Sequence, residues 1–302
     1  MLNPGGSGAL APSGEPEGPL PDIDKTSTAI LALAPNGAYK QKADHPALPI
    51  TIDEIVQTAV KAQIEGMTLL HLHIRDANGQ HSLDPDTYRR TIDAIRKQAG
   101  GHLIIQITSE AAGQFSPEQQ IVSIQAVNPE SVSISLREIA PDKASLPAAL
   151  RLFHWCAEQQ CRPQFILYSE ADLLSYLQYR KQNIIPSEPH SILFVLGRYT
   201  QQRGSTTADL DPFLKYQTQI SVPWMVCAFG ASEQECLLYA AEKGGHMRLG
   251  FENNLLNAQG QVANSNIEQL QAIAGAAGDS GMSFATSQEA RKMLRIRKHF
   301  RD

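Results

Sequence analysis

The sequence predicts a (β/α)8 TIM barrel, an α/β fold in which eight parallel strands alternate with eight helices. Short apolar runs alternate along the chain with longer segments of helical periodicity, and this alternation indicates a parallel sheet. The chain has 302 residues, and eight such units over about 250 residues match the size of this barrel. An open doubly wound sheet is the alternative, but no Gly-x-Gly-x-x-Gly motif follows any expected strand.

The elements follow one another in strand–helix pairs. The expected strands cover residues 29–33, 68–74, 103–107, 131–136, 164–168, 192–196, 222–229 and 246–251. The expected helices cover residues 51–65, 86–98, 117–125, 146–159, 170–179, 210–216, 232–242 and 266–277. The first helix has a particularly clear start, because Thr51 and Glu54 form a capping box.

Two segments lie outside this repeat. Residues 1–24 contain five Gly and five Pro with almost no large apolar residues, and such a composition predicts a flexible tail. Residues 25–302 then form a single barrel domain, with an extra C-terminal helix expected over residues 287–300.

Composition excludes several classes of protein. The net charge of −5 argues against a nucleic-acid-binding protein, which normally has a basic face. No apolar run approaches the roughly 20 residues that cross a bilayer, and the N-terminus lacks the features of a secretory signal, so we expect a cytoplasmic protein without membrane contact. The four cysteines form no Cys-x-x-Cys pair, so neither a disulfide framework nor a zinc ribbon is expected.

Two histidines on the second strand indicate a catalytic metal site. Side chains alternate faces along a strand, so His71 and His73 point the same way, toward the barrel axis. On the eighth strand, the same alternation turns Arg248 and Glu252 inward. This strand closes the barrel beside the first, so Glu252 is expected to reach the two histidines. Two His and one Glu leave a position open for substrate, as in catalytic zinc sites.

Further polar residues are expected at the carboxyl ends of the strands, where barrel active sites lie. Arg248 suits a substrate that carries a carboxylate. Thr108 and Ser109 end the third strand and offer hydroxyl groups to a carboxylate or carbonyl. Glu138, which follows the fourth strand, and Glu110 are both candidates for the general base, and zinc-bound hydroxide is a third.

The motifs as a set resemble the β-keto acid cleavage enzymes, from about Ala29 to Ala276. The motifs that carry this resemblance are Asn36-Gly37-Ala38 with Asp44-His45-Pro46, the run from His71 to Asp76, Gln106-Ile107-Thr108, and the run from Gly244 to Asn254. In that family, a zinc-bound β-keto acid reacts with acetyl-CoA, and a retro-Claisen cleavage yields acetoacetate and a new acyl-CoA.

The resemblance implies site residues and partners. Zinc is expected on His71, His73 and Glu252, with Arg248 at the reacting centre. Substrate contacts are expected from Thr108 and Ser109, and acetyl-CoA is the co-substrate. A homotetramer is also implied.

Three positions depart from the family member of lysine fermentation. That enzyme has an acidic residue directly after the zinc-binding Glu, where this chain has Asn253. The carboxylate that binds the substrate amine in that enzyme corresponds in position to Tyr39 of this chain. A second functional Glu of that enzyme corresponds to about Ile166. We therefore expect Asn36, Tyr39 and Asn253 to contribute to a substrate site for a β-keto acid without a 5-amino cation. A zinc-dependent hydrolase or lyase acting on a small carboxylate, and an inactive metal-binding homologue, are the alternative functions.

Overall fold

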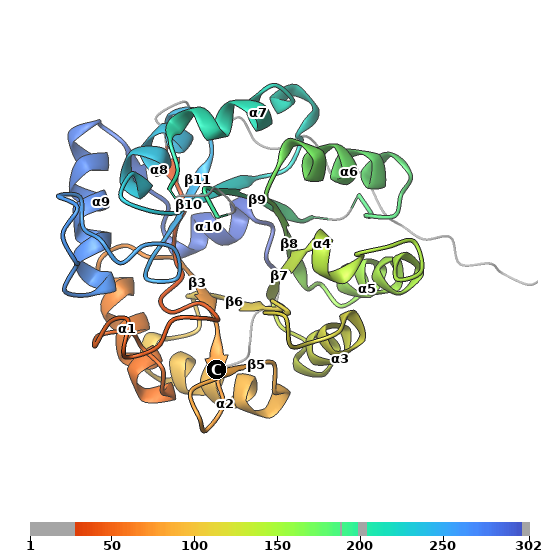
Figure 1. The fold of residues 1–302 in the computed structure, drawn as a ribbon, viewed down its shortest axis with the longest axis horizontal. Helices are drawn as coiled ribbons and strands as arrows, with labels where there is room; N and C mark the ends of the chain where they lie inside the picture. Colours follow the sequence, from red (N-terminus) through yellow and green to blue (C-terminus); the bar gives the residue numbers. More distant parts are fainter. Residues whose placement is uncertain (1–27, 188, 199–203, 298–302) are drawn as a thin grey trace, which may run out of the picture.

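The computed structural model describes residues 28–187, 189–198 and 204–297. Eight strands form a closed barrel in the order β10-β11-β2-β3-β6-β7-β8-β9 (Figure 1), and every neighbouring pair is parallel. The predicted (β/α)8 barrel is therefore confirmed, and the open sheet is excluded. The expected tail, residues 1–24, lies outside the described residues.

The elements follow the predicted order closely. The barrel strands are β2 (Leu31–Leu33), β3 (Leu69–Leu72), β6 (Ile104–Thr108), β7 (Ser131–Ser135), β8 (Arg162–Leu167), β9 (Ser191–Leu196), β10 (Trp224–Ala228) and β11 (His246–Leu249). The main helices are α1 (Ile52–Ile64), α2 (Pro85–Ala99), α3 (Pro117–Val127), α5 (Leu146–Glu158), α6 (Glu170–Lys181), α8 (Glu233–Glu242) and α9 (Asn266–Asp279). Two short pairings, β1 (Thr28–Ala29) with β12 (Ser283–Phe284) and β4 (Ile74–Arg75) with β5 (His81–Ser82), lie outside the barrel sheet.

Local sequence determines where several helices begin. The capping box of α1 is present, because the Thr51 hydroxyl accepts from Glu54 N while the Glu54 carboxylate accepts from Thr51 N. Ser116 caps α3 in the same way, through Gln119. Each box satisfies backbone N–H groups that have no partner within the helix.

Each barrel strand packs one face against the helices and the other against the interior of the barrel. Leu70 and Leu72 belong to the large cluster between the strands and the helices, whereas Leu69 belongs to a separate cluster inside the barrel. The inner cluster continues into α10 (Ser287–Met293) and the residues after it, including Leu294 and Ile296. The C-terminal segment therefore closes the N-terminal end of the barrel and leaves the opposite end for the site.

Several predicted elements are shorter in the structure, among them the second barrel strand, which ends at Leu72. The helix expected over residues 210–216 is a 3-10 turn, η1 (Thr207–Leu210), and a single α-turn, α7 (Asp211–Leu214). In η1 only Leu210 is buried, and in α7 only Phe213 is buried. Because helices in proteins are stabilised mainly by packing of a buried face, this packing is too little to support a longer helix. The terminal helix expected to reach residue 300 ends at Met293, and Arg295 follows with a positive φ of 52°.

The eighth strand also ends early, at Leu249 rather than at residue 251. Gly250 has a φ of +132°, and a Cβ at this position would lie 2.3 Å from the carbonyl oxygen of Ala34. Glu252 consequently belongs to the turn after β11 and not to the strand itself. Among the described residues, no helix is both long and apolar enough to cross a membrane.

Candidate active site

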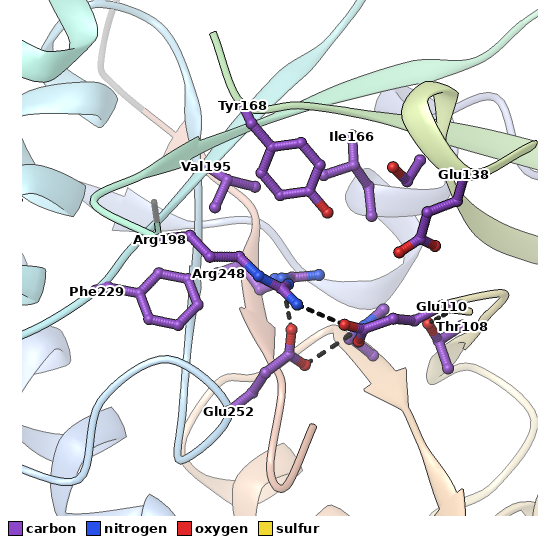
Figure 2. Close-up of a pocket in the computed structure, with 12 residues that line it drawn as sticks. Thr108, Glu110, Glu138, Ile166, Tyr168, Val195, Arg198, Phe229, Arg248 and Glu252 are labelled. Atoms are coloured by element: carbon purple, nitrogen blue, oxygen red, sulfur yellow. Dashed lines mark hydrogen bonds and ion pairs between the residues drawn. The ribbon is translucent and has the colours of Figure 1, made fainter. Parts of the chain in front are cut away.

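The predicted metal ligands come together at the carboxyl end of the barrel. β11 pairs with β2 and β2 pairs with β3, so the turn after β11 lies close to the end of β3. The Nε2 atoms of His71 and His73 are 3.1 Å apart. Glu252 Oε2 lies 3.5 Å from His71 Nε2 and 3.3 Å from His73 Nε2. Figure 2 shows the Glu252 carboxylate below Arg248 in the cavity.

This donor set fits a divalent metal. The three ligand atoms lie within 4.8 Å of one another, and ligand atoms of a tetrahedral zinc site, bonded at about 2.0–2.1 Å, are roughly 3.3 Å apart. Glu252 Oε2 is buried and has no hydrogen-bond partner among the described residues. A buried carboxylate oxygen without a hydrogen bond is costly unless an ion pairs with it. The geometry therefore favours a cation held by His71, His73 and Glu252.

The protonation states also suit metal binding. Burial, together with the nearby Arg248, holds the pKa of His71 well below its ordinary value, so its imidazole is neutral at pH 7. Burial alone would raise the pKa of Glu252, but the positive charge of Arg248 leads the opposing effects, and contacts with His71 and His73 act in the same direction, so the pKa lies well below its ordinary value. Metals bind neutral imidazole and ionised carboxylate, so these two groups need lose no proton before binding at neutral pH.

Arg248 places a second positive group beside these ligands. Its Nη2 donates to Glu252 Oε1 at 3.0 Å and contacts Cys227 Sγ at 3.5 Å. Its Nε and Nη1 are buried without a partner among the described residues. A guanidinium that keeps unpartnered N–H donors beside the candidate metal ligands can still bind an anionic group such as a carboxylate.

The site opens into a cavity at the mouth of the barrel. The residues that line it are His71, Thr108, Glu110, Ser135, Glu138, Ile166, Tyr168, Val195, Arg198, Phe229, Arg248 and Glu252. His71, Glu252 and the Arg248 guanidinium thus share one hollow with apolar and acidic groups.

The family model for beta-keto acid cleavage enzyme matches residues 28–296. This chain belongs to the beta-keto acid cleavage enzyme family. It is 27% identical over 274 residues to a 3-keto-5-aminohexanoate cleavage enzyme from Fusobacterium nucleatum subsp. nucleatum, an alignment that covers 89% of this chain and 98% of that one. A 3-oxoadipate:acetyl-CoA acetyltransferase from Cupriavidus necator is 24% identical over 276 residues, covering 89% of this chain and 95% of that one.

Solved structures support the fold. The structure titled apo structure of ObcA superposes with a TM-score of 0.68 at 16% identity, covering 83% of this chain and 66% of that one. A type I 3-dehydroquinate dehydratase from Clostridium difficile superposes with a TM-score of 0.55 at 9% identity, covering 84% of this chain and 93% of that one.

Thr108 and Ser109 were both predicted to contact the substrate of this beta-keto acid cleavage enzyme, but their side chains point in different directions. Thr108 lines the cavity, and its hydroxyl accepts from Glu110 N at 3.0 Å. Ser109 is buried, and its hydroxyl donates to Ser133 O at 2.8 Å. Successive side chains point to opposite sides of a strand, so Ser109 turns away from the cavity that Thr108 faces.

Asn36, Tyr39 and Asn253 lie around the site without lining the cavity. Asn36 Nδ2 donates to Pro49 O at 2.9 Å and to His73 O at 3.4 Å. These bonds help to position the backbone of His73, a candidate metal ligand. Tyr39 is 62% exposed at the rim. Asn253 is buried, and neither polar atom of its amide has a partner among the described residues.

Both candidate bases face the cavity. Glu138 follows β7 in the short helix α4 (Leu136–Ile139), where its Oε2 accepts from Ala111 N and Gln120 Nε2. Burial raises the pKa of Glu138. Glu110 follows β6, and its Oε2 lies 3.9 Å from His73 Nε2.

Sequence reasoning missed the group around Arg198. This residue follows β9, and its Nη2 pairs with Glu110 Oε1 at 2.6 Å. Tyr168 after β8 and Phe229 after β10 lie beside it in the same cavity. Their position at the ends of barrel strands was the available signal, but aromatic residues at strand ends are too common to point to a site.

Proposed function

We propose that this protein catalyses the zinc-dependent cleavage of a β-keto acid with acetyl-CoA, giving acetoacetate and a new acyl-CoA. In this reaction, the bond between the keto carbon and the methylene carbon of the substrate breaks. The methylene carbon, with its carboxylate, joins the acetyl group, and the acyl fragment ends on the sulfur of CoA. Membership of the family and the names of the two relatives support this reaction.

The unpartnered N–H groups of Arg248 are the observation that carries the proposal. A β-keto acid has a carboxylate two carbons from its ketone, and the Arg248 guanidinium lies beside the candidate metal ligands, 3.0 Å from Glu252. A divalent metal bound at His71, His73 and Glu252 would supply Lewis-acid polarisation of the keto oxygen. The unpartnered N–H groups of Arg248 would bind and orient the carboxylate.

We assign the general base to Glu138. A base that works near neutral pH needs a carboxyl pKa above its ordinary value, and burial shifts Glu138 in this direction. Glu110, which is paired with Arg198, is the second candidate. We propose Thr108, which lines the cavity, as a substrate hydroxyl contact, and Ser109 and Asn36 as residues that support the site.

The walls of the cavity favour a substrate with a neutral tail. Ile166 and Val195 present apolar surface, and Tyr39, which is largely exposed, offers no carboxylate to an amine. We therefore expect poor turnover of the 5-amino substrate. We also propose a homotetramer, which sedimentation velocity would test.

A substrate panel combined with metal analysis tests the function. Purified protein is incubated with acetyl-CoA and β-keto acids of varied tail, and acetoacetate is measured together with bound zinc. Acetoacetate that requires acetyl-CoA supports the proposal, cleavage without CoA supports a hydrolase, and bound zinc without activity supports an inactive homologue. A clear preference for the 5-amino substrate would refute the neutral tail.

The ligand set has its own test. His73→Ala should abolish both metal binding and activity, whereas the exposed His102→Ala should change neither. Stoichiometric zinc retained in His73→Ala would refute the assignment of this residue as a ligand.

A further inference from the structure

The guanidinium of Arg198 lies among three aromatic rings at the mouth of the cavity, with Tyr168 and Phe229 lining the cavity and Tyr39 at its rim. Its central carbon lies 5.8 Å from the ring centroid of Tyr39, 5.7 Å from that of Tyr168 and 6.0 Å from that of Phe229. The carboxylate of Glu110 completes the enclosure at 2.6 Å. Aromatic faces combined with a carboxylate form the usual recognition site for a cation, and quaternary ammonium groups in particular.

This cage of three rings and a carboxylate shares walls with the catalytic cavity. Tyr168, Phe229, Arg198 and Glu110 all line the hollow that contains Arg248. Figure 2 shows the Arg198 side chain passing between Phe229 and Tyr168 toward Glu110. The guanidinium therefore fills space that lies within reach of a substrate bound at the metal ligands.

The Arg198–Glu110 pair is shielded from water. The two side chains are 20% and 9% exposed, so the charge of the guanidinium is less screened than that of a surface arginine. A substrate tail with a positive charge would meet both a filled cage and a like charge. A neutral tail meets neither obstacle, because the apolar wall at Ile166 and Val195 remains open to it.

We propose that Arg198 is a specificity-determining residue that excludes β-keto acids with a cationic tail by filling the cage of Tyr39, Tyr168, Phe229 and Glu110. The corollary is that removal of the guanidinium creates a binding site for a quaternary ammonium group. This inference rests on the proposed function for its effect on turnover, but the binding site itself does not.

Binding is measured first, on the metal-loaded protein, with tetramethylammonium as the probe. Arg198→Ala should bind tetramethylammonium at least about tenfold more tightly than the wild type, because a desolvated cation–π site with a carboxylate replaces a filled one. Arg198→Lys retains a positive charge in the cage and should behave as the wild type. The double variant Arg198→Ala with Glu110→Gln should lose most of the gain.

Turnover is measured second, with a neutral-tailed and a trimethylammonium-tailed β-keto acid. The ratio of kcat/KM for the cationic to the neutral acid should rise by at least about tenfold in Arg198→Ala. If the wild type turns over no β-keto acid, the proposed function fails. The tetramethylammonium measurement still tests whether removal of Arg198 creates a cation-binding site. If Arg198→Ala is poorly folded by thermal melting, Arg198→Ser serves as the second variant.

Two outcomes would overturn the inference. One is unchanged tetramethylammonium affinity in folded Arg198→Ala and Arg198→Ser. The other is a wild-type preference for a dicarboxylic β-keto acid that is selectively lost in Arg198→Ala, since Arg198 would then bind an anionic tail instead of excluding a cationic one.

Discussion

Gln106 Oε1 lies 2.9 Å from His71 Nδ1, and this contact determines which nitrogen of His71 faces the metal site. Because Gln106 Nε2 donates to Ser131 Oγ at 3.3 Å, its Oε1 is the atom that meets His71, and a carbonyl oxygen accepts only. His71 Nδ1 must therefore carry the proton, which leaves the Nε2 lone pair directed toward His73 and Glu252. Such outer hydrogen bonds orient the ligands of metal sites.

Gln106→Leu should weaken metal binding while leaving the ligands in place. Loss of the acceptor removes the preference for the Nδ1–H tautomer, and partners of this kind contribute about 10–100-fold to metal affinity. Competition with a zinc-binding dye measures the change. The exposed Gln125→Leu on α3 is the matched control, and unchanged zinc affinity in Gln106→Leu would contradict the proposed role.

Arg248→Lys should impair catalysis without releasing the metal. Lysine keeps the charge near Glu252 but lacks the fixed, planar set of N–H donors, so it cannot bind Glu252 and a substrate carboxylate in the same arrangement. We expect kcat/KM to fall by about 10²–10³-fold at unchanged zinc stoichiometry. The exposed Arg89→Lys should retain full activity, and an active Arg248→Lys enzyme would show that the guanidinium is dispensable.

Glu138→Gln should remove the acidic limb of the pH–rate profile. Burial raises the pKa of Glu138, so the wild-type carboxylate becomes protonated, and kcat/KM declines, at a pH above the ordinary value for Glu. The amide cannot accept the proton, and we expect kcat to fall by about 10²–10⁴-fold. Glu118→Gln on the exposed face of α3 is the control.

Normal activity and an unchanged pH profile in Glu138→Gln would show that Glu138 is not the general base, and Glu110 would be tested next. Because Glu138 Oε2 also accepts from Ala111 N, a thermal melt of the variant distinguishes loss of the base from local unfolding.

Glu130→Ala should destabilise the fold at the opposite end of the barrel. Glu130 is 1% exposed and pairs with Arg96 at 2.6 Å and with Arg291 at 2.8 Å. Removal of one member of a buried ion pair leaves uncompensated charge, and we expect a loss of about 3–5 kcal/mol in the free energy of unfolding. Urea unfolding measures this loss.

The control is Asp86→Ala, which breaks an exposed pair with Arg89 and should cost less than about 1 kcal/mol. Equal losses in the two variants would show that burial of the Glu130 pairs adds nothing to stability.

The barrel and the convergence of its three candidate metal ligands were predictable from sequence because they depend on simple rules of strand geometry and barrel closure. Alternation along a strand placed His71 and His73 on one face, and closure of the barrel brought Glu252 to them. Helix positions followed from periodicity and from caps such as Thr51. The strand ending at Leu249 was less predictable, because a contact between Gly250 and Ala34, distant in sequence, sets its end.

The sequence by itself therefore determined the fold class, the family and the three residues that come together as a candidate metal site. Only the tertiary structure decided that Ser109 points away from the cavity, that Asn36 supports the backbone of His73, and that Arg198 reaches Glu110. The physical reason is that these outcomes depend on side-chain directions and on contacts between separate loops. The pairing of Arg198 with Glu110 joins residues 88 positions apart, and no local periodicity records such a contact.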